Sequence, residues 1–199
     1  KLHLLGGDAR HPAAHRYIQR LPGLSVLLFA SDGWLTMVQD LNGSKLFTMT
    51  RYAFTSEGLD IGHLSDLASR VPPGLQIVAI DLPLARSLDN EKGEFATDHM
   101  LNFDSPEDFC ERGFGFCALG EKGIASAATT FAICERGIEI QINTREEHQG
   151  QGLATAVAAR LLLDSLELGL DPNWDAANEA SVALAQKLGY TSQGEYPMY

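Results

Sequence analysis

A glycine-containing loop in the second half of the chain has the composition of an anion-binding site. The segment 139–155 reads EIQINTREEHQGQGLAT, in which an alternating strand pattern leads into Gly150 and Gly152 and then into an apolar helix pattern. Glycines let the backbone approach an anion closely, and the N–H groups and dipole at the start of a helix favour negative charge. The segment therefore predicts a phosphate-binding turn, although such a loop alone is often only a tight connection.

Two common phosphate motifs are excluded by the residues around these glycines. No Gly-Lys-Ser/Thr sequence follows, as a nucleoside-triphosphate loop requires, and Thr155 stands where the dinucleotide fingerprint needs its last glycine. The remaining pattern is the hexapeptide QGQGLA at 149–154. The residues expected to bind the phosphate groups are Gln149, Gly150, Gln151, Gly152, Leu153, Ala154 and Thr155.

A second helix pattern, NEASVALAQKLGY at 178–190, follows further along the chain. Asn178 is a typical N-cap residue whether or not it also touches a ligand. Ser181 lies close enough to the helix start to meet a phosphate or pantetheine, or to satisfy backbone N–H groups instead. Trp174, just before this helix, either packs in a core or stacks on an adenine ring. These alternatives stay open on the sequence alone.

Together, the hexapeptide, the strand before it and the helix from Asn178 resemble the GNAT family of N-acetyltransferases, and further a bacterial subgroup with an additional N-terminal region. The resemblance covers about residues 113–199 and extends less specifically over 64–96. In that family the hexapeptide binds the pyrophosphate of acetyl-CoA. The resemblance implies acetyl-CoA as co-substrate, no metal, and direct attack by the amine of a small molecule or a protein.

The same resemblance implies functions for residues of the strand that precedes the loop. An amine is mostly protonated at neutral pH, so a base or a chain of water molecules has to remove its proton. Glu139 is the best-placed carboxylate and shares a strand face with Gln141 and Asn143; an exposed glutamate without a role is the alternative. A backbone N–H near Ile142 or Asn143 would polarise the thioester carbonyl. Ile142, Asn143 and Thr144 would pair with pantetheine as a strand does.

One position departs from the family pattern and keeps other hypotheses open. Many members carry a tyrosine seven residues after the helix asparagine, whose hydroxyl protonates the leaving thiolate, whereas this chain has Ala185. Solvent, or the hydroxyl of Tyr190, Tyr196 or Tyr199, could protonate the thiolate instead.

Two other functions stay open beside the N-acetyltransferase. One is a GNAT-fold module that binds acyl-CoA without catalysis, as a sensor or scaffold. The other is an unrelated α/β nucleotide or phosphate binder.

The elements that position these residues follow from the apolar patterns. The second half predicts a short helix capped by Ser105, helices at 153–168 and 178–188, and strands at 114–119, 124–133, 138–144, 172–176 and 190–199. This order predicts an α/β (α+β) fold with a sheet of mixed strand directions. The GNAT resemblance further implies a mostly antiparallel sheet with flanking helices, in which the central strands at 138–144 and 172–176 are nearly parallel and splay apart, with the cofactor in the gap.

The first half is less regular. Leu24–Phe29 predicts a strand, Trp34–Val38 its hairpin partner, 60–71 a helix and 75–80 a strand, while the polar stretch Ser87–Ala96 predicts a loop or linker. We expect a smaller α/β segment at 1–98 and a GNAT-like acetyl-CoA-binding domain at 99–199.

Charge and cysteine content limit the partners. The chain of 199 residues has a net charge of −11, and residues 101–199 carry 6 basic and 15 acidic side chains. This surface disfavours nucleic acid and favours a cationic amine, or only keeps the protein soluble. No apolar run is long enough to cross a membrane. Cys110, Cys117 and Cys134 lack ligand spacing, so we expect reduced thiols, no metal and a cytoplasmic location. A homodimer is left open.

Overall fold

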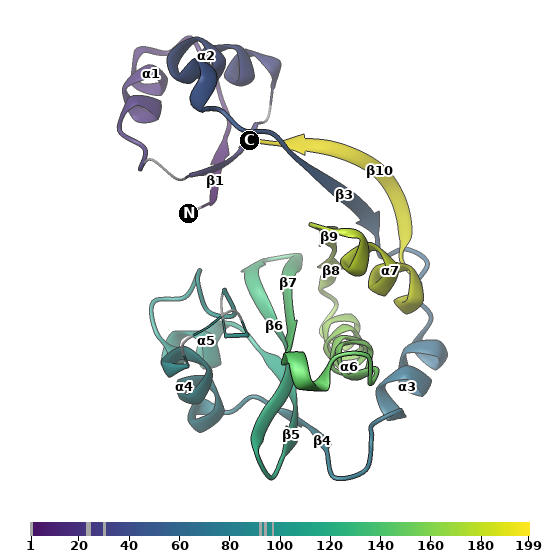
Figure 1. Ribbon diagram of the computed structural model, residues 1–199. Coiled ribbons are helices and arrows are strands. Elements are labelled where there is room, and N and C mark those ends of the chain that lie inside the picture. Colours follow the sequence, from purple (N-terminus) through teal and green to yellow (C-terminus); the bar gives the residue numbers. More distant parts are fainter. Residues whose placement is uncertain (1, 23–24, 30, 92, 94, 97) are drawn as a thin grey trace. The chain divides into compact units, whose positions relative to one another are not determined.

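The computed structural model describes residues 2–22, 25–29, 31–91, 93, 95–96 and 98–199. The chain forms two compact units, one made of residues up to Arg51 together with Glu195–Tyr199, the other of Tyr52–Gly194. Strands β3 (Met49–Thr55) and β10 (Thr191–Met198) each run through both units (Figure 1). The two units meet at other residues than the domain boundary expected between residues 98 and 99. That boundary stays a prediction.

The first unit packs two helices against a pair of strands. Strands β1 (Leu2–Leu5) and β2 (Val26–Phe29) pair in parallel, and helices α1 (Pro12–Gln19) and α2 (Asp32–Asn42) bury their apolar sides beside them. The short 3-10 helix η1 (Gly43–Lys45) follows α2. The strand expected at Leu24–Phe29 is confirmed over Val26–Phe29, and Leu24 lies outside the described residues.

The hairpin partner expected at Trp34–Val38 is wrong, because these residues belong to α2. Asp32-Gly33 resembles a hairpin turn in sequence, but here it forms the first turn of the helix. Trp34 and Val38 are four residues apart, so a helix buries both on one side, and they are 5% and 0% exposed. The Trp34 indole N–H also donates to the carbonyl of Gly7 at 3.1 Å.

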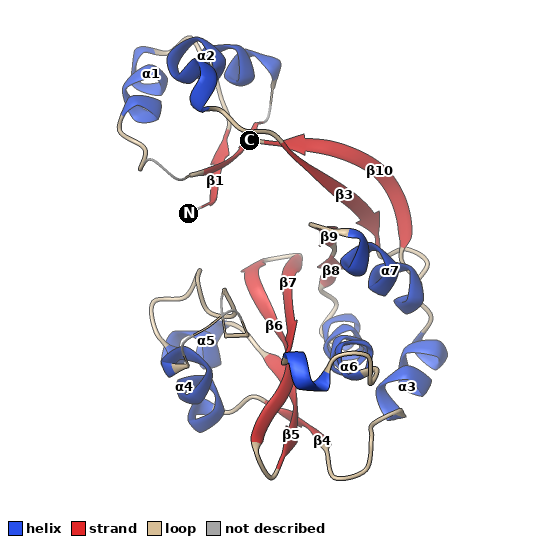
Figure 2. Ribbon diagram, viewed as in Figure 1, coloured by secondary structure: helices blue, strands red, loops and turns tan. Residues whose placement is uncertain are grey.

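The second unit is built on a five-stranded sheet in the order β4-β5-β6-β7-β8 (Figure 2). The strands are β4 (Gln76–Ala79), β5 (Gly115–Gly120), β6 (Gly123–Cys134), β7 (Gly137–Thr144) and β8 (Asp171–Asn173). Neighbours are antiparallel except β7 and β8, which are parallel. This is the mixed, mostly antiparallel sheet that the sequence predicts.

Helices cover both faces of this sheet. On one face, α4 (Leu82–Asn90) and α5 (Pro106–Arg112) pack over β4, β5 and β6. On the other face lies α6 (Leu153–Glu167), which itself packs against α3 (Ile61–Ser69) and α7 (Glu179–Leu188). No helix among the described residues is both long and apolar enough to span a bilayer.

The loop expected at Ser87–Ala96 is wrong over its first four residues, which complete α4. The Asp81 carboxylate caps this helix by accepting from the N–H of Leu84 at 3.0 Å, and a proline lies in its first turn. Ala85 and Leu88, three residues apart, are buried against the sheet. The polar residues between them face solvent, which is why composition alone suggests a loop.

The two parallel strands part, as the family resemblance implies, but the single strand expected at 172–176 is wrong, because the chain divides at Trp174 into two short strands of different sheets. β7 and β8 pair at Gly137↔Asp171, Ile138↔Pro172 and Glu139↔Asn173, after which β7 continues to Thr144 without β8 beside it. The chain beyond Asn173 turns away into β9 (Asp175–Ala176), which pairs with β3 in a separate sheet of order β10-β3-β9. The β8 side of β7 beyond Glu139 thus has no strand partner among the described residues.

Tyr190 holds β8 at the point where the strands part. Its hydroxyl donates to the carbonyl of Pro172 at 2.7 Å, and the residue is 5% exposed. Burial is the main cause that raises the pKa of this phenol above its ordinary value, and the carboxylates of Asp171 and Glu139 act in the same direction. The hydroxyl proton is therefore committed to the backbone.

Replacing Tyr190 with phenylalanine should lower the free energy of unfolding by about 1–3 kcal/mol, because the Pro172 carbonyl would lose its buried partner. Urea denaturation of the purified variant measures this. Tyr17→Phe is the matched control, because that hydroxyl lies in an exposed pair with His3 and its loss should cost less than about 0.5 kcal/mol. Equal effects for the two variants would contradict the role given to Tyr190.

Candidate active site

The predicted phosphate loop joins the end of β7 to the start of α6. After Arg145 the chain forms the 3-10 helix η2 (Glu146–His148) and then passes through Gly150 and Gly152. These two glycines have φ of 72° and 81°, a left-handed conformation that other residues rarely adopt, and a Cβ placed on either one would meet no atom within 4 Å. The loop therefore leaves open space beside a backbone that only glycine forms without strain.

The N-terminus of α6 lacks the side-chain cap that most helices of this unit have. Its N-cap is Gly152, which makes no side-chain hydrogen bond. By contrast, α3, α4, α5 and α7 are each capped by a side chain, from Asp60, Asp81, Ser105 and Asn178. The first N–H groups of a helix have no partner within the helix, and those of α6 follow directly on the loop of the two glycines. This arrangement suits a phosphate group.

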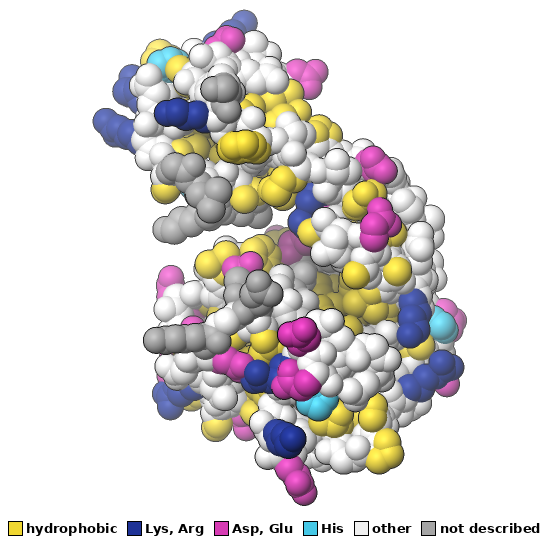
Figure 3. Space-filling view, in the orientation of Figure 1, with side chains coloured by type: hydrophobic (Ala, Val, Ile, Leu, Met, Phe, Trp, Pro, Cys, Tyr) yellow, Lys and Arg dark blue, Asp and Glu magenta, His cyan; other side chains and the backbone are white. Residues whose placement is uncertain are grey.

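The charged side chains around the loop are not arranged to bind an anion, so the backbone would have to do so. The Arg145 guanidinium is engaged on three sides: it donates to the carbonyl of Ile124 at 2.6 Å, pairs with Glu91 at 2.6 Å and lies 4.4 Å from the centre of the Phe95 ring. Glu146 and Glu147, the first two residues of η2, have exposed acidic side chains, and acidic side chains are visible around this segment in Figure 3. No lysine lies in 145–155, so N–H groups and the dipole of α6 would carry the attraction for an anion.

The two glutamines of the loop hold its shape. The side-chain amide of Gln149 donates to the carbonyl of Thr144 at 3.4 Å, and that of Gln151 donates to the carbonyl of Glu147 at 3.2 Å. Leu153, at the first helical position, is 1% exposed and anchors the helix start in the core beneath the sheet. These contacts keep the backbone of the loop in place for a ligand.

The polar residues of β7 lie on the face opposite α6, as the period of two predicts. Ile138, Ile140 and Ile142 join the core under α6, which leaves Glu139, Gln141 and Asn143 on the α4–α5 face. The Glu139 carboxylate accepts a hydrogen bond from the side-chain amide of Asn173, at the last residue pair before β7 and β8 part. Glu139 thus stands at the vertex of the splay, half-buried.

Asn143 reaches across to the segment that follows α4. Its side-chain amide donates to the carbonyl of Phe95 at 2.9 Å. On the β6 side, Ser126 donates to the carbonyl of Asn143 at 3.1 Å and lies 2.7 Å from the hydroxyl of Thr144. The end of β7 is therefore held from β6 and from the α4–α5 connection, while no strand of the described part of the chain pairs with its β8 side.

At α7 the contacts of Asn178, Ser181 and Trp174 are those of helix capping and core packing. The Asn178 side chain accepts from the N–H of Ser181 at 2.9 Å and so caps α7. Ser181 accepts a hydrogen bond from the Trp174 indole at 3.2 Å, and Trp174 is 5% exposed within the core. Ala185 is fully buried. A ligand contact by Asn178 or Ser181 stays a prediction, and Trp174 packs in the core.

His99 is a buried titratable residue that no sequence pattern singles out. It is 1% exposed, and its Nδ1 lies 2.8 Å from the Thr129 hydroxyl on β6. Burial lowers the pKa of this imidazole to about 4, against a weaker opposing effect of the Phe95 carbonyl. Thr129 pairs with Gln141 across the β6–β7 ladder, so His99 lies over the same sheet face as the polar residues of β7. A single histidine in a loop gives no signal from which this contact could be predicted.

The free energy of unfolding should fall as the pH drops from about 6.5 to about 4. In this window His99 of the unfolded chain takes up a proton while the buried ring of the folded chain stays neutral, so the unfolded state binds more protons. The full effect amounts to roughly 3 kcal/mol. Urea unfolding of the wild type and His99→Gln at pH 7 and pH 5 measures it. A pH slope that is the same in both proteins would contradict this origin.

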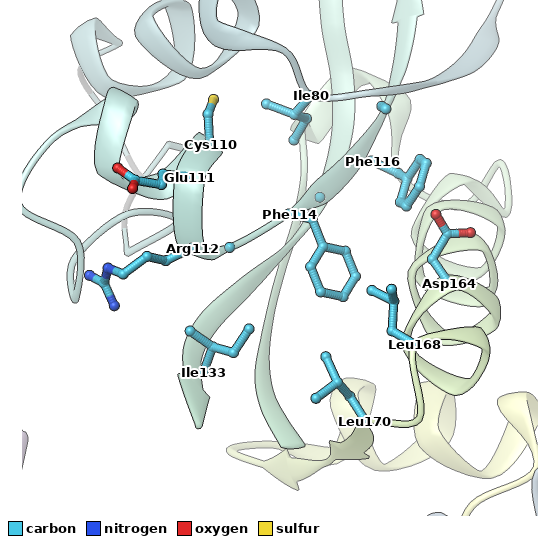
Figure 4. A pocket seen from close by; sticks show the side chains of 13 residues that line it. Ile80, Cys110, Glu111, Arg112, Phe114, Phe116, Ile133, Asp164, Leu168 and Leu170 are labelled. Carbon is cyan, nitrogen blue, oxygen red and sulfur yellow. The ribbon is translucent and has the colours of Figure 1, made fainter. Parts of the chain in front are cut away.

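A groove of about 430 Å³ lies away from the predicted phosphate loop. Its walls come from α5, β5, β6 and the C-terminal end of α6, and Phe114, Leu168 and Leu170 point toward one another there (Figure 4). None of the residues that the sequence assigns to the cofactor lines it. The groove is at the opposite end of α6 from Gly152.

Comparisons with known proteins agree with this geometry. The family model described as GNAT acetyltransferase matches residues 3–199. An uncharacterised N-acetyltransferase of Bacillus subtilis, YdfB, is 30% identical over 175 residues, which cover 87% of this chain but only 64% of the length of that relative.

Solved structures show the same likeness. A GCN5-related N-acetyltransferase-like protein from Streptococcus suis superposes with a TM-score of 0.85 at 31% identity, covering 99% of this chain and 78% of that one. An acetyltransferase of the GNAT family from Novosphingobium aromaticivorans, at 16% identity, covers 77% of this chain and 64% of its own with a TM-score of 0.55, which shows the fold alone. This chain belongs to the GNAT acetyltransferase family.

Proposed function

We propose that this chain transfers an acetyl group from acetyl-CoA to an amine by direct attack. The observation that carries the proposal is the uncapped N-terminus of α6, which opens from two left-handed glycines immediately after the parallel strands part. The pyrophosphate would bind the N–H groups between Gly150 and Thr155. The acceptor is the amine of a small molecule or of a protein, and no metal takes part.

Pantetheine would extend from the loop along the side of β7 that has no strand partner among the residues described. There the backbone of Ile142, Asn143 and Thr144 offers hydrogen-bonding groups in strand geometry, since β8 pairs with β7 only as far as Glu139. A backbone N–H in this stretch would stabilise the oxyanion that forms when the amine adds to the thioester carbonyl. The acetyl group would then lie near the vertex of the splay.

Glu139 would act as the base at that vertex. It takes one proton from the ammonium group, and the neutral nitrogen attacks the carbonyl carbon. The carbon–sulfur bond then breaks to release the thiolate of coenzyme A, and the nitrogen gives its second proton to solvent, which leaves the amide. The hydroxyl of Tyr190 is committed to Pro172, and Ala185 has no acidic group. We therefore propose solvent as the source of the proton for the thiolate, and a role for the hydroxyl of Tyr196 or Tyr199 stays a prediction.

The three cysteines support a reducing compartment such as the cytoplasm. Cys117 is fully buried, and burial raises the pKa of its thiol to about 12, while Cys110 and Cys134 are exposed and free.

Release of free thiol from acetyl-CoA on addition of a library of amines tests the proposed activity. We expect thiol release with at least one amine and a raised melting temperature with coenzyme A. A raised melting temperature without thiol release for any amine would favour the acyl-CoA-binding module without catalysis. No thermal shift with coenzyme A would favour an unrelated phosphate binder and contradict the proposal.

A further inference from the structure

Arg145 is the residue at which the chain leaves β7 for the predicted phosphate loop, and its backbone is fixed on both sides. Its N–H donates to the carbonyl of Ala125 at 2.9 Å, which extends the β6–β7 ladder by one residue. Its carbonyl accepts from the N–H of His148 at 2.9 Å, which closes η2. The direction in which the chain enters the loop is therefore set at Arg145.

The side chain of Arg145 lies on the face of the sheet opposite α6. Arg145 comes two residues after Asn143, so it continues the row of polar side chains on the α4–α5 face. Its contacts agree, because Glu91 ends α4 and Phe95 packs against the core beneath α4 and α5. The first N–H groups of α6, which would bind the pyrophosphate, belong to a helix on the other face.

Glu91 neutralises the charge of Arg145 within the fold. Its two carboxylate oxygens lie 2.6 and 2.7 Å from one guanidinium nitrogen, and the side chains of Arg145 and Glu91 are only 29% and 23% exposed. The Nε–H of the same guanidinium donates to the carbonyl of Ile124 at 2.6 Å. Removing one partner of such a sheltered ion pair leaves an uncompensated charge, which is costly. The pair thus ties the end of α4 to the start of the loop.

We propose that Arg145 is a positioning residue for coenzyme A: with Glu91 it fixes the place where the loop leaves β7, and it does not itself bind the pyrophosphate. The loop follows from this junction without a break, so a shift of Arg145 would displace the backbone at Gly150 and Gly152. This inference rests on the proposed function, because the loop is the proposed site of the pyrophosphate.

The two possible roles of Arg145 give effects of opposite sign when Glu91 is replaced. Glu91→Gln keeps the size of the side chain and removes its charge. If Arg145 positions the loop, the anchor weakens and coenzyme A binds less tightly. If Arg145 is instead a phosphate ligand that Glu91 holds back, the guanidinium is released and coenzyme A binds more tightly.

We expect Glu91→Gln to weaken the binding of coenzyme A by ~3–10-fold and Arg145→Gln by ~10–100-fold, since the second variant loses the bonds to both Glu91 and Ile124. Arg145→Lys should lie between the wild type and Arg145→Gln, because an ammonium group can pair with Glu91 but cannot also donate from the position of Nε. Isothermal titration calorimetry with coenzyme A measures the three affinities, and urea unfolding checks that each variant is folded.

Pantetheine separates positioning of the loop from general damage to the fold. It lacks the pyrophosphate, so Glu91→Gln should leave its binding unchanged when followed by NMR, whereas a protein damaged throughout the site would lose both ligands. Glu107→Gln is the matched control, because it removes an ion pair between α4 and α5, with Arg86, that does not involve Arg145. It should bind coenzyme A as the wild type does.

The outcomes distinguish this inference from the proposed function. An affinity for coenzyme A that is unchanged or higher in Glu91→Gln would overturn the inference and leave the transferase standing. Binding of pantetheine that weakens to the same degree as binding of coenzyme A would also overturn it, because the loss would not belong to the loop. Failure of the wild type to bind coenzyme A would contradict the proposed function, and this inference with it.

Discussion

Replacing Glu139 with glutamine should lower kcat by ~10²–10⁴-fold, the range expected when a general base is lost. Glutamine has the same shape and can still accept from Asn173, so the vertex of the splay should keep its geometry. The affinity for coenzyme A should be nearly unchanged, because Glu139 lies at the end of the unpaired edge of β7 that is remote from Gly152. Stopped assays of thiol release over a range of amine concentrations measure the effect.

The pH–rate profile adds a second test of the base. The wild type should lose activity on the acidic side as the carboxylate is protonated, and the variant should lack this limb. Glu135→Gln, in the exposed turn between β6 and β7, is the matched control and should keep wild-type turnover. Wild-type turnover and an unchanged profile in Glu139→Gln would assign proton removal to water and leave the cofactor assignment standing.

Replacing Gly152 with valine should reduce the affinity for coenzyme A by ~10²-fold or more, as expected when several hydrogen bonds to a charged group are lost together. At φ of 81° a β-branched residue is strained, so the loop would relax and withdraw its N–H groups. The new side chain would also fill the space where the pyrophosphate is expected. Isothermal titration calorimetry with coenzyme A measures the change.

Backbone strain by itself has to be separated from the loss of the site. Gly74 offers the control, because it has φ of 84° and similar open space where a Cβ would lie, but it belongs to the turn before β4. Both valine variants should lose stability by roughly 1–2 kcal/mol, the cost of a left-handed residue. Only Gly152→Val should lose coenzyme A affinity. Equal affinities in the two variants would remove the loop from the cofactor site.

Local patterns were sufficient to predict the elements around the cofactor loop. The long apolar stripe of α6, the N-cap at Asn178 and the glycine after α7 are decided by neighbours in sequence, and each appears where it was expected. The splay follows the family resemblance, and its physical cause became visible only in the structure. Trp174 turns into the core and Tyr190 fixes Pro172, so β8 stops after three residues.

Other features depend on contacts between distant parts of the chain. The segment at Trp34–Val38 fits a strand or a helix equally well as an apolar run, and only its burial beside β1 and β2 decides for the helix. The hydrogen bond from Asn173 to Glu139 and the burial of His99 under Thr129 join residues about 30 positions apart. No spacing rule within one element predicts such contacts.

A crystal structure with coenzyme A bound tests the central claim most directly. We expect pyrophosphate oxygens within hydrogen-bonding distance of backbone N–H groups between Gly150 and Thr155, and pantetheine paired with the backbone of Ile142–Thr144 along the edge that β8 leaves open. Coenzyme A bound elsewhere, for example in the groove at the C-terminal end of α6, with the Gly150–Gly152 loop facing solvent, would contradict it.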